Sequence, residues 1–154
     1  MISHTAGIRR GRPTDADAIA RLTREAYGKW VDLIGREPLP MQADYVDAVA
    51  RHRFDLLIDG DDLVGLIETA PEGDHLLIVN VAVRPAAQGR GFGKRLLAHA
   101  ETLAAEVGLR GMRLYTNERF VENIRLYAAL GYTVERTETL ERGVVVHMVK
   151  PLTG

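Results

Sequence analysis

The chain contains no cysteine among its 154 residues. Disulfide bonds, thiolate metal clusters and covalent catalysis through a cysteine are therefore excluded. The five histidines are scattered and show no metal-ligand spacing, so we expect no bound metal.

The sequence also lacks a strong net charge and a long apolar run. Its formal net charge is −1, with both signs interspersed, which gives no long-range field to attract nucleic acid. No apolar run approaches the length of a bilayer span, and Met1–Arg10 has no apolar stretch before its arginines. We therefore expect no secretion and no membrane association, and a cytoplasmic location.

What the chain does contain is enough apolar material for one core. Apolar residues make up 46% of the sequence, and no repeat or low-complexity linker interrupts it. A chain of this length buries roughly two-thirds of its unfolded surface. We expect a single domain over residues 1–154.

The first third of the sequence predicts one strand and two helices. Thr14-Asp15-Ala16-Asp17 resembles a capping box, in which Thr14 would cap a helix that continues to about Tyr27. The segment Gly28–Pro40 holds two prolines and two glycines and predicts a long loop or a broken helix. The remaining elements expected here are a strand, Ile8–Arg10, and a helix, Gln42–Arg51.

The rest of the sequence predicts strands alternating with two helices. The turn Asp59-Gly60-Asp61-Asp62 predicts a hairpin. The strands His75–Val83 and Met112–Thr116 should run parallel to each other, because the helix Lys94–Val107 joins them as a crossover. The expected strands are Phe54–Ile58, Leu63–Thr69, His75–Val83, Met112–Thr116, Tyr132–Arg136 and Val144–Val149, with helices at Lys94–Val107 and Val121–Leu130 and a connection at Thr137–Gly143.

The most informative stretch is Gln88-Gly89-Arg90-Gly91-Phe92-Gly93, which lies between a predicted strand and a predicted helix. Unpaired backbone N–H groups converge at such a helix N-terminus, and the helix dipole adds about half a positive charge. Glycines allow close approach of the backbone to a ligand, and Arg90, Lys94 and Arg95 add cationic charge. The segment therefore predicts a cradle for a diphosphate.

Two common phosphate motifs do not fit this stretch. A Walker A loop requires Ser or Thr after Gly-Lys, but Arg95 follows Gly93-Lys94. A dinucleotide fingerprint requires Gly-x-Gly-x-x-Gly and a carboxylate near Leu114 or Tyr115, and neither is present.

The stretch instead resembles the Gln/Arg-x-x-Gly-x-Gly/Ala pyrophosphate loop of the GNAT N-acyltransferase superfamily. The resemblance continues upstream through Asn80–Pro85 and downstream through Asn123–Tyr132, which is similar to the family's Asn-x-x-x-x-Tyr-x-x-x-Gly-Phe/Tyr segment. It implies an α/β (α+β) fold with a mixed, twisted central sheet of about six to seven strands, flanked by about four helices. It also implies direct transfer of an acetyl group from acetyl-CoA to an amine, without a metal.

The resemblance assigns most of the cofactor contacts. The backbone of Val81, Ala82 and Val83 would pair with the pantetheine arm of acetyl-CoA, and Asn123 would contact the same arm. Tyr127 matches the tyrosine that donates a proton to the departing thiolate, although a tyrosine at this spacing also fits a packed core. The pyrophosphate loop would comprise Gln88, Gly89, Arg90, Gly91, Phe92, Gly93 and Lys94.

The general base has several candidates. A lysine-type amine must lose a proton before it attacks. His75 stands where some relatives carry a glutamate, and Glu68 ends an apolar strand and faces either a cleft or solvent. Asn80 is a further polar candidate, and a water relay without a single base is also compatible with these residues.

The acceptor is open at this stage. The family's acceptor groove corresponds to Tyr27–Tyr45 and Thr137–Arg142. A small-molecule amine is slightly favoured over a protein α-amine or lysine, because the chain shows no extended charged docking surface. An exposed edge among the last strands would support a homodimer. The alternative from another class is a noncatalytic acyl-CoA-binding or sensor domain, which would not need Tyr127.

Overall fold

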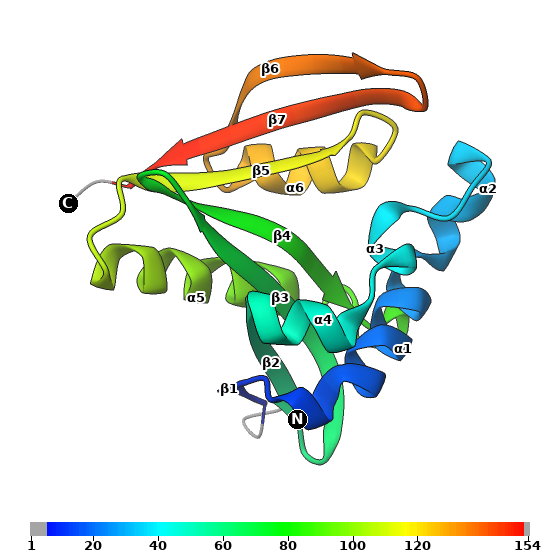
Figure 1. Ribbon diagram of the computed structural model, residues 1–154, viewed down its shortest axis with the longest axis vertical. Coiled ribbons are helices and arrows are strands. Elements are labelled where there is room, and N and C mark those ends of the chain that lie inside the picture. Colours follow the sequence, from blue (N-terminus) through cyan, green and yellow to red (C-terminus); the bar gives the residue numbers. More distant parts are fainter. Residues whose placement is uncertain (1–5, 153–154) are drawn as a thin grey trace. The chain divides into compact units, whose positions relative to one another are not determined.

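A computed structural model describes residues 6–152, so Met1–Thr5, part of the N-terminal segment Met1–Arg10 considered above, lie outside the described residues. The described chain alternates strands and helices in the order expected (Figure 1). The strands are β1 (Gly7–Arg10), β2 (Arg53–Asp59), β3 (Asp62–Glu72), β4 (His75–Val83), β5 (Gly111–Asn117), β6 (Thr133–Leu140) and β7 (Gly143–Pro151). The longer helices are α1 (Ala16–Tyr27), α4 (Tyr45–Arg51), α5 (Phe92–Glu106) and α6 (Val121–Ala129), and α2 (Val31–Ile34) and α3 (Leu39–Gln42) are single turns.

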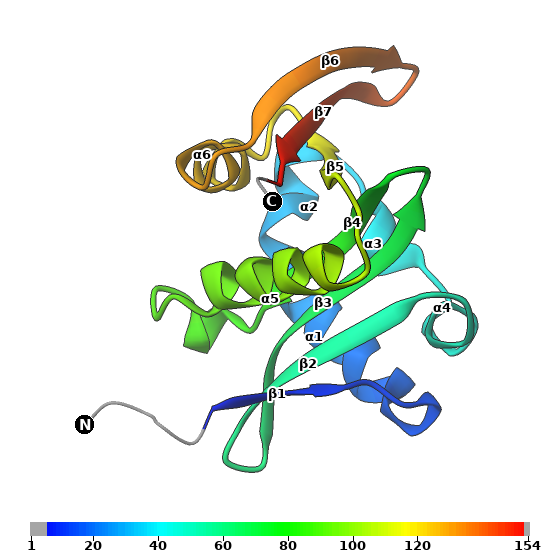
Figure 2. The ribbon, with the colours of Figure 1, turned by 90° about the vertical axis from the view of Figure 1, so that its left-hand side faces the viewer.

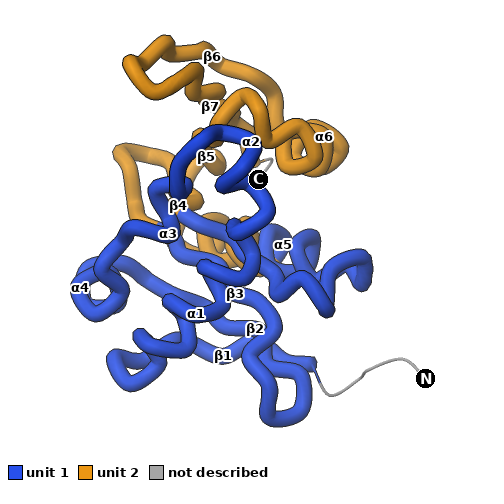
Figure 3. Tube along the Cα trace, turned by 90° about the vertical axis from the view of Figure 1, so that its right-hand side faces the viewer, with its two compact units in different colours: residues 1–69, 80–98 blue, residues 70–79, 99–154 orange. Residues whose placement is uncertain are grey.

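The strands form a mixed sheet in the order β1-β2-β3-β4-β5-β7-β6. The seven strands and four longer helices confirm the predicted fold class. The described chain divides into two compact units, residues 6–69 with 80–98 and residues 70–79 with 99–152 (Figure 3). Within these residues, none of the helices combines the length and the apolar character that crossing a bilayer requires.

The core of the first unit lies between its strands and helices α1 and α4. Ile19, Leu22 and Ala26 recur at helical spacing on α1 and are buried. They pack with Leu56 of β2 and Leu66 of β3, which are opposite each other in the antiparallel β2–β3 pair (Figure 2). On the other face, a Cβ placed on Gly65 would meet Leu96 of α5 at 3.0 Å, so α5 packs directly against this glycine.

The second unit contains the C-terminal strands. The parallel pairing of β4 with β5 runs from His75↔Gly111 to Ile78↔Leu114, which confirms the predicted crossover. Strand β7 pairs antiparallel with β5 on one side and with β6 on the other.

Three local predictions were wrong. Thr14 does not cap α1, since a short 3-10 turn, Pro13–Asp15, precedes the helix and the Asp15 carboxylate accepts the Arg12 backbone N–H at 2.7 Å. Helix α4 begins at Tyr45 rather than Gln42, because Asp44 caps it by accepting the N–H groups of the next turn. The expected connection Thr137–Gly143 is largely strand, since β6 continues to Leu140 and β7 starts at Gly143.

Candidate functional site

The glycine-rich loop between β4 and α5 contains two glycines in the left-handed region of backbone conformation. Gly89 and Gly91 adopt φ values of +83° and +80°, and a Cβ at either position would meet nothing within 4 Å. The first described helical bond of α5 runs from Arg95 N–H to Gly91 O at 3.1 Å. The N–H groups of the preceding turn have no acceptor within the helix, as at any helix N-terminus. Helix α5 begins at Phe92, two residues before the predicted start at Lys94, so Phe92 and Gly93 at the end of the predicted loop are helical.

Two side chains fix the ends of this loop. Gln88 Nε2 donates to Val83 O at 3.1 Å and ties the loop to the end of β4. Arg90 Nη2 lies 3.3 Å from Asp59 Oδ2, and the Arg90 guanidinium lies 4.6 Å from the centre of the Phe92 ring. Arg90 thus packs against Phe92 and pairs with β2, while Lys94 and Arg95 are exposed at the start of the helix.

A buried polar network surrounds the last part of β4 in the first unit. Tyr27 Oη donates to Asn80 Oδ1 at 2.9 Å and lies 3.4 Å from Val81 O. Asn80 Nδ2 lies 3.4 Å from Tyr45 Oη, which in turn donates to Pro40 O at 2.6 Å. Burial, as the main cause, raises the pKa of Tyr45 to about 12. The network therefore joins β4 to α1, to α4 and to the segment between them.

Glu68 lies in the same unit and is paired with a histidine. Its side chain is buried, and Oε2 lies 2.6 Å from His52 Nδ1. Burial raises the pKa of the Glu68 carboxyl, although the hydrogen bond from His52 works in the opposite direction. The negative charge of Glu68 also contributes to the raised pKa of Tyr45. Glu68, Tyr45 and Asn80 therefore belong to one polar cluster.

Sequence reasoning missed His52. The residue stands between two arginines at the junction of a helix and a strand, which is a pattern typical of a solvated turn. Its partner is 16 positions away. The only available signal was the glutamate in an otherwise apolar strand, because a buried carboxylate requires a hydrogen-bonding partner.

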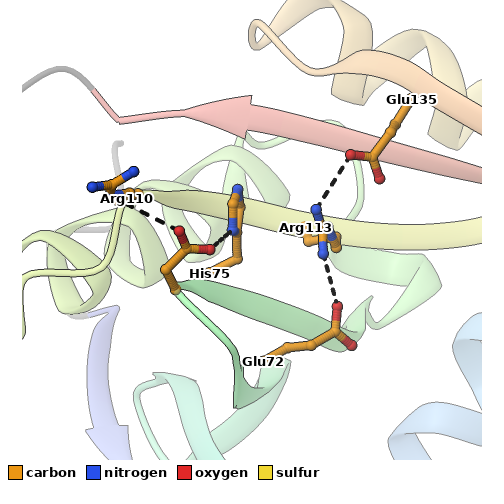
Figure 4. Close-up of polar contacts among 6 residues, drawn as sticks. Glu72, His75, Arg110, Arg113 and Glu135 are labelled. Atoms are coloured by element: carbon orange, nitrogen blue, oxygen red, sulfur yellow. Dashed lines mark hydrogen bonds and ion pairs between the residues drawn. The ribbon is translucent and has the colours of Figure 1, made fainter.

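His75, the other candidate base, lies in the second unit at the start of β4. Its Nδ1 is 2.6 Å from Asp74 Oδ1, and its ring would lie 3.0 Å from a Cβ placed on Gly111. The hydrogen bond to His75 lowers the pKa of the Asp74 carboxyl. Figure 4 shows His75 near Arg110, and shows Arg113 between the carboxylates of Glu72 and Glu135. The described hydrogen-bond partner of His75 is thus the exposed carboxylate of Asp74, on its own unit.

Tyr127 and Asn123 lie one turn apart on α6, in the second unit. Tyr127 is buried, and its ring centre lies 6.0 Å from that of Tyr132. Burial raises the pKa of the Tyr127 phenol, so the side chain keeps its proton at neutral pH. The hydroxyl of Tyr132 is also buried, and it has no hydrogen-bond partner among the described residues.

The comparison with family models gives one match that covers most of the chain. Residues 17–132 match the model of the acetyltransferase (GNAT) family. A curated relative, the uncharacterized N-acetyltransferase YvbK of Bacillus subtilis, is 32% identical over 79 residues. That alignment spans 49% of this chain and 50% of YvbK, so it covers about half of each protein.

Solved structures resemble the fold over nearly its full length. The PaiA N-acetyltransferase of Thermoplasma acidophilum, in complex with coenzyme A, superimposes with a TM-score of 0.82 at 19% identity, over 96% of this chain and 99% of that one. The ribosomal-protein-S18-alanine N-acetyltransferase of Escherichia coli gives a TM-score of 0.77 at 19% identity, over 97% and 96% of the two chains. At these identities the likeness shows the fold.

Proposed function

Since the chain belongs to the GNAT acetyltransferase family, we propose that it transfers an acetyl group from acetyl-CoA directly to a primary amine in a ternary complex. The observation that carries this proposal is the loop Gln88–Gly93, with two glycines at positive φ directly before α5. This loop would hold the pyrophosphate of acetyl-CoA through backbone N–H groups, supplemented by the charges of Lys94 and Arg95.

The backbone next to the loop would hold the rest of the donor. Val81, Ala82 and Val83 end β4, beyond the last described pair with β5 at Ile78. Their peptide groups would pair with the amides of the pantetheine arm, as an added strand does. We assign Asn123 to the same arm.

Glu68 is our choice for the general base, ahead of His75. A buried carboxyl with a raised pKa is suited to taking a proton near neutral pH. Glu68 also belongs to the cluster that includes Tyr45 and Asn80, and Asn80 directly precedes Val81 in β4. The described contacts of His75 lie instead with Asp74 and Gly111.

Tyr127 would stabilise the leaving thiolate. The thioester C–S bond breaks as the amine nitrogen bonds to the acetyl carbon, and negative charge develops on sulfur. A phenol whose pKa is raised by burial remains protonated and can donate a hydrogen bond to that sulfur. This need for a donor distinguishes an enzyme from a domain that only binds acyl-CoA.

A small-molecule amine is the acceptor that we favour, since no extended charged docking surface is apparent in the sequence. A protein α-amine is the second candidate, because one structural neighbour is named for the alanine of ribosomal protein S18. The segment Tyr27–Tyr45 would form part of the acceptor site, because the network around Asn80 anchors both of its ends.

An accurate-mass screen tests the proposal. Acetyl-CoA and the protein are incubated with a pool of diamines, amino acids and short peptides, with a protein-free control. A protein-dependent product heavier by one acetyl group supports the transferase and identifies its acceptor class. If CoA compounds bind but no product forms, a noncatalytic acyl-CoA-binding domain is the better description.

A further inference from the structure

The contact between Glu68 and His52 joins a buried group to a more exposed one. The Glu68 side chain is 5% exposed, whereas that of His52 is 24% exposed. The His52 backbone N–H donates to Ala48 O at 2.8 Å at the end of α4. The histidine is thereby fixed at the junction of α4 and β2, with Nδ1 2.6 Å from the carboxylate.

The other groups around Glu68 are less suited to accept its proton. From α4, Tyr45 keeps its proton, since its pKa is raised to about 12, and its hydroxyl donates a hydrogen bond to Pro40 O. Arg51 is always charged and lies 2.7 Å from Asp47 Oδ2. Phe54, opposite Glu68 on β2, and Asn80 on β4 do not titrate. Among the described neighbours, His52 is the group whose two ring nitrogens can take up a proton on one side of the ring and release one on the other.

Acetylation of an ammonium acceptor must release one proton in each cycle. The ammonium loses two protons in forming the amide, and the CoA thiolate takes up one of them. The other must leave the site. If Glu68 removes it, the carboxyl must be deprotonated again before the next turnover, although its side chain is almost completely buried.

We infer that His52 is a positioning and relay residue that carries this proton from Glu68 to solvent. In the resting state, the Nδ1–H of His52 donates a hydrogen bond to the Glu68 carboxylate. Once Glu68 has taken the acceptor's proton, exchange with water moves the hydrogen of the ring from Nδ1 to Nε2. The Glu68 carboxyl then donates its proton to Nδ1 and Nε2 releases one proton to water, which restores the resting state, so protons balance over the cycle. The inference rests on the proposed function, in which Glu68 is the base.

Two substitutions of His52 distinguish a role in proton transfer from a purely structural role. His52→Asn retains an N–H donor near the Nδ1 position but does not titrate, and His52→Ala removes the ring. With acetyl-CoA and the best acceptor from the amine screen, both variants should lose kcat by about tenfold or more. KM for acetyl-CoA should stay unchanged, and calorimetric binding of acetyl-CoA checks that each variant is folded.

Added small molecules give a readout that a purely structural role would not change. Imidazole should restore turnover to the His52→Ala variant, because the position is open to solvent. Pyrazole has a similar shape but is not protonated near neutral pH, so it should not restore turnover. Equal rescue by both compounds would mean that filling the volume of the missing ring is enough to restore turnover. Proton transfer by the ring would then not be required, and the relay would be overturned.

His147→Asn serves as the matched control. His147 Nε2 lies 3.1 Å from Glu138 Oε1 on the paired strands β6 and β7, so this variant disrupts another histidine–carboxylate contact. Its turnover should equal that of the wild type. If His52→Asn is also as active as the wild type, the relay is wrong while the transferase stands. If the wild type itself yields no acetylated product, the proposed function fails and the relay fails with it.

Discussion

At the scale of single residues, burial sets the chemistry of the two groups proposed to move protons. Tyr127 and Glu68 both have raised pKa values, mainly through loss of solvent. A raised pKa has different consequences for the two groups. The phenol stays protonated and can donate its proton, whereas the carboxylate becomes a stronger base. Substitutions that remove only the titrating group test each role.

Tyr127→Phe should slow acetyl transfer by about tenfold or more while leaving the affinity for acetyl-CoA nearly unchanged. The reason is that the ring remains to pack beside Tyr132, and only the donor to the leaving sulfur is lost. Single-turnover kinetics and calorimetric binding measure the two effects separately.

Tyr132→Phe is the matched control, because its hydroxyl is buried without a partner among the described residues. Removing an unsatisfied hydroxyl loses no hydrogen bond, so this variant should retain its turnover and should be at least as stable as the wild type. Unchanged turnover in both variants would remove Tyr127 from the mechanism.

Glu68→Gln should change stability in a pH-dependent way. A carboxyl whose pKa is raised on folding favours the folded state below its unfolded pKa, and this contribution is lost as pH rises through the folded pKa. The wild type should therefore lose stability relative to the Gln variant as pH rises from the unfolded pKa of a glutamate, about 4.3, through the raised pKa of the folded state. Urea unfolding at a series of pH values measures the difference, and a constant difference would contradict the burial argument.

At the scale of elements, local patterns in the sequence predicted what local forces determine. The apolar run from His75 to Val83 predicted β4 with the bounds that the structure shows. The glycine-rich loop was predictable for the same reason, because positive φ at Gly89 and Gly91 is a local requirement. Half of β6 was mistaken for a loop, since its polar sequence becomes strand only through pairing with β7.

Contacts between distant positions were not predictable in this way. Glu68 was a candidate site residue, but its partner His52 emerges only when β3 lies beside the end of α4. The prediction of Thr14 as a helix cap was wrong for the same reason, because the contacts that fix the start of α1 involve Asp15 and a distant arginine. Asp15 bonds to Arg9, six positions upstream, as well as to the Arg12 backbone.

The start of α1 offers a direct test of this correction. Asp15 accepts two hydrogen bonds of 2.9 Å from Arg9 and one from Arg12 N–H. Asp15→Ala should lower the free energy of unfolding by about 1–2 kcal/mol at neutral pH, allowing for the partial exposure of Arg9. Thr14→Ala, at an exposed position, should change it by less than about 0.5 kcal/mol.

The effect of Asp15→Ala should also depend on pH. The hydrogen bond from Arg9 is the main reason that the pKa of Asp15 is lowered. Its stabilisation is present above the unfolded pKa and is lost as pH falls through the lowered folded pKa, so the gap to the wild type should close in acid. A larger effect from Thr14→Ala in chemical denaturation would restore the original capping prediction.

At the scale of the whole molecule, the proposed roles are divided between the two compact units. The pyrophosphate loop and Glu68 belong to the first unit, and Tyr127 and Asn123 belong to the second. Strands β3 and β4 and helix α5 each contribute residues to both units. Binding of the donor should stabilise the whole chain against unfolding, since a ligand that binds only the folded state stabilises that state.

Acetyl-CoA at 100 times its Kd should stabilise the protein by about 2.7 kcal/mol, or a rise in Tm of roughly 5–10 °C. Gly91→Glu should abolish this rise, because the side chain places a negative charge where the pyrophosphate would bind. The substitution also lowers stability by about 1–2 kcal/mol, because a non-glycine residue must adopt φ near +80°.

Gly73→Glu separates the two effects of that substitution. Gly73 has φ of +60° in the β3–β4 turn, and a Cβ there would also meet nothing within 4 Å. The control therefore carries a similar backbone strain and the same added charge, but at a position outside the loop. Its Tm should fall as for Gly91→Glu, while the rise with acetyl-CoA should remain that of the wild type. A full ligand-induced rise in Gly91→Glu would mean that the pyrophosphate is held elsewhere.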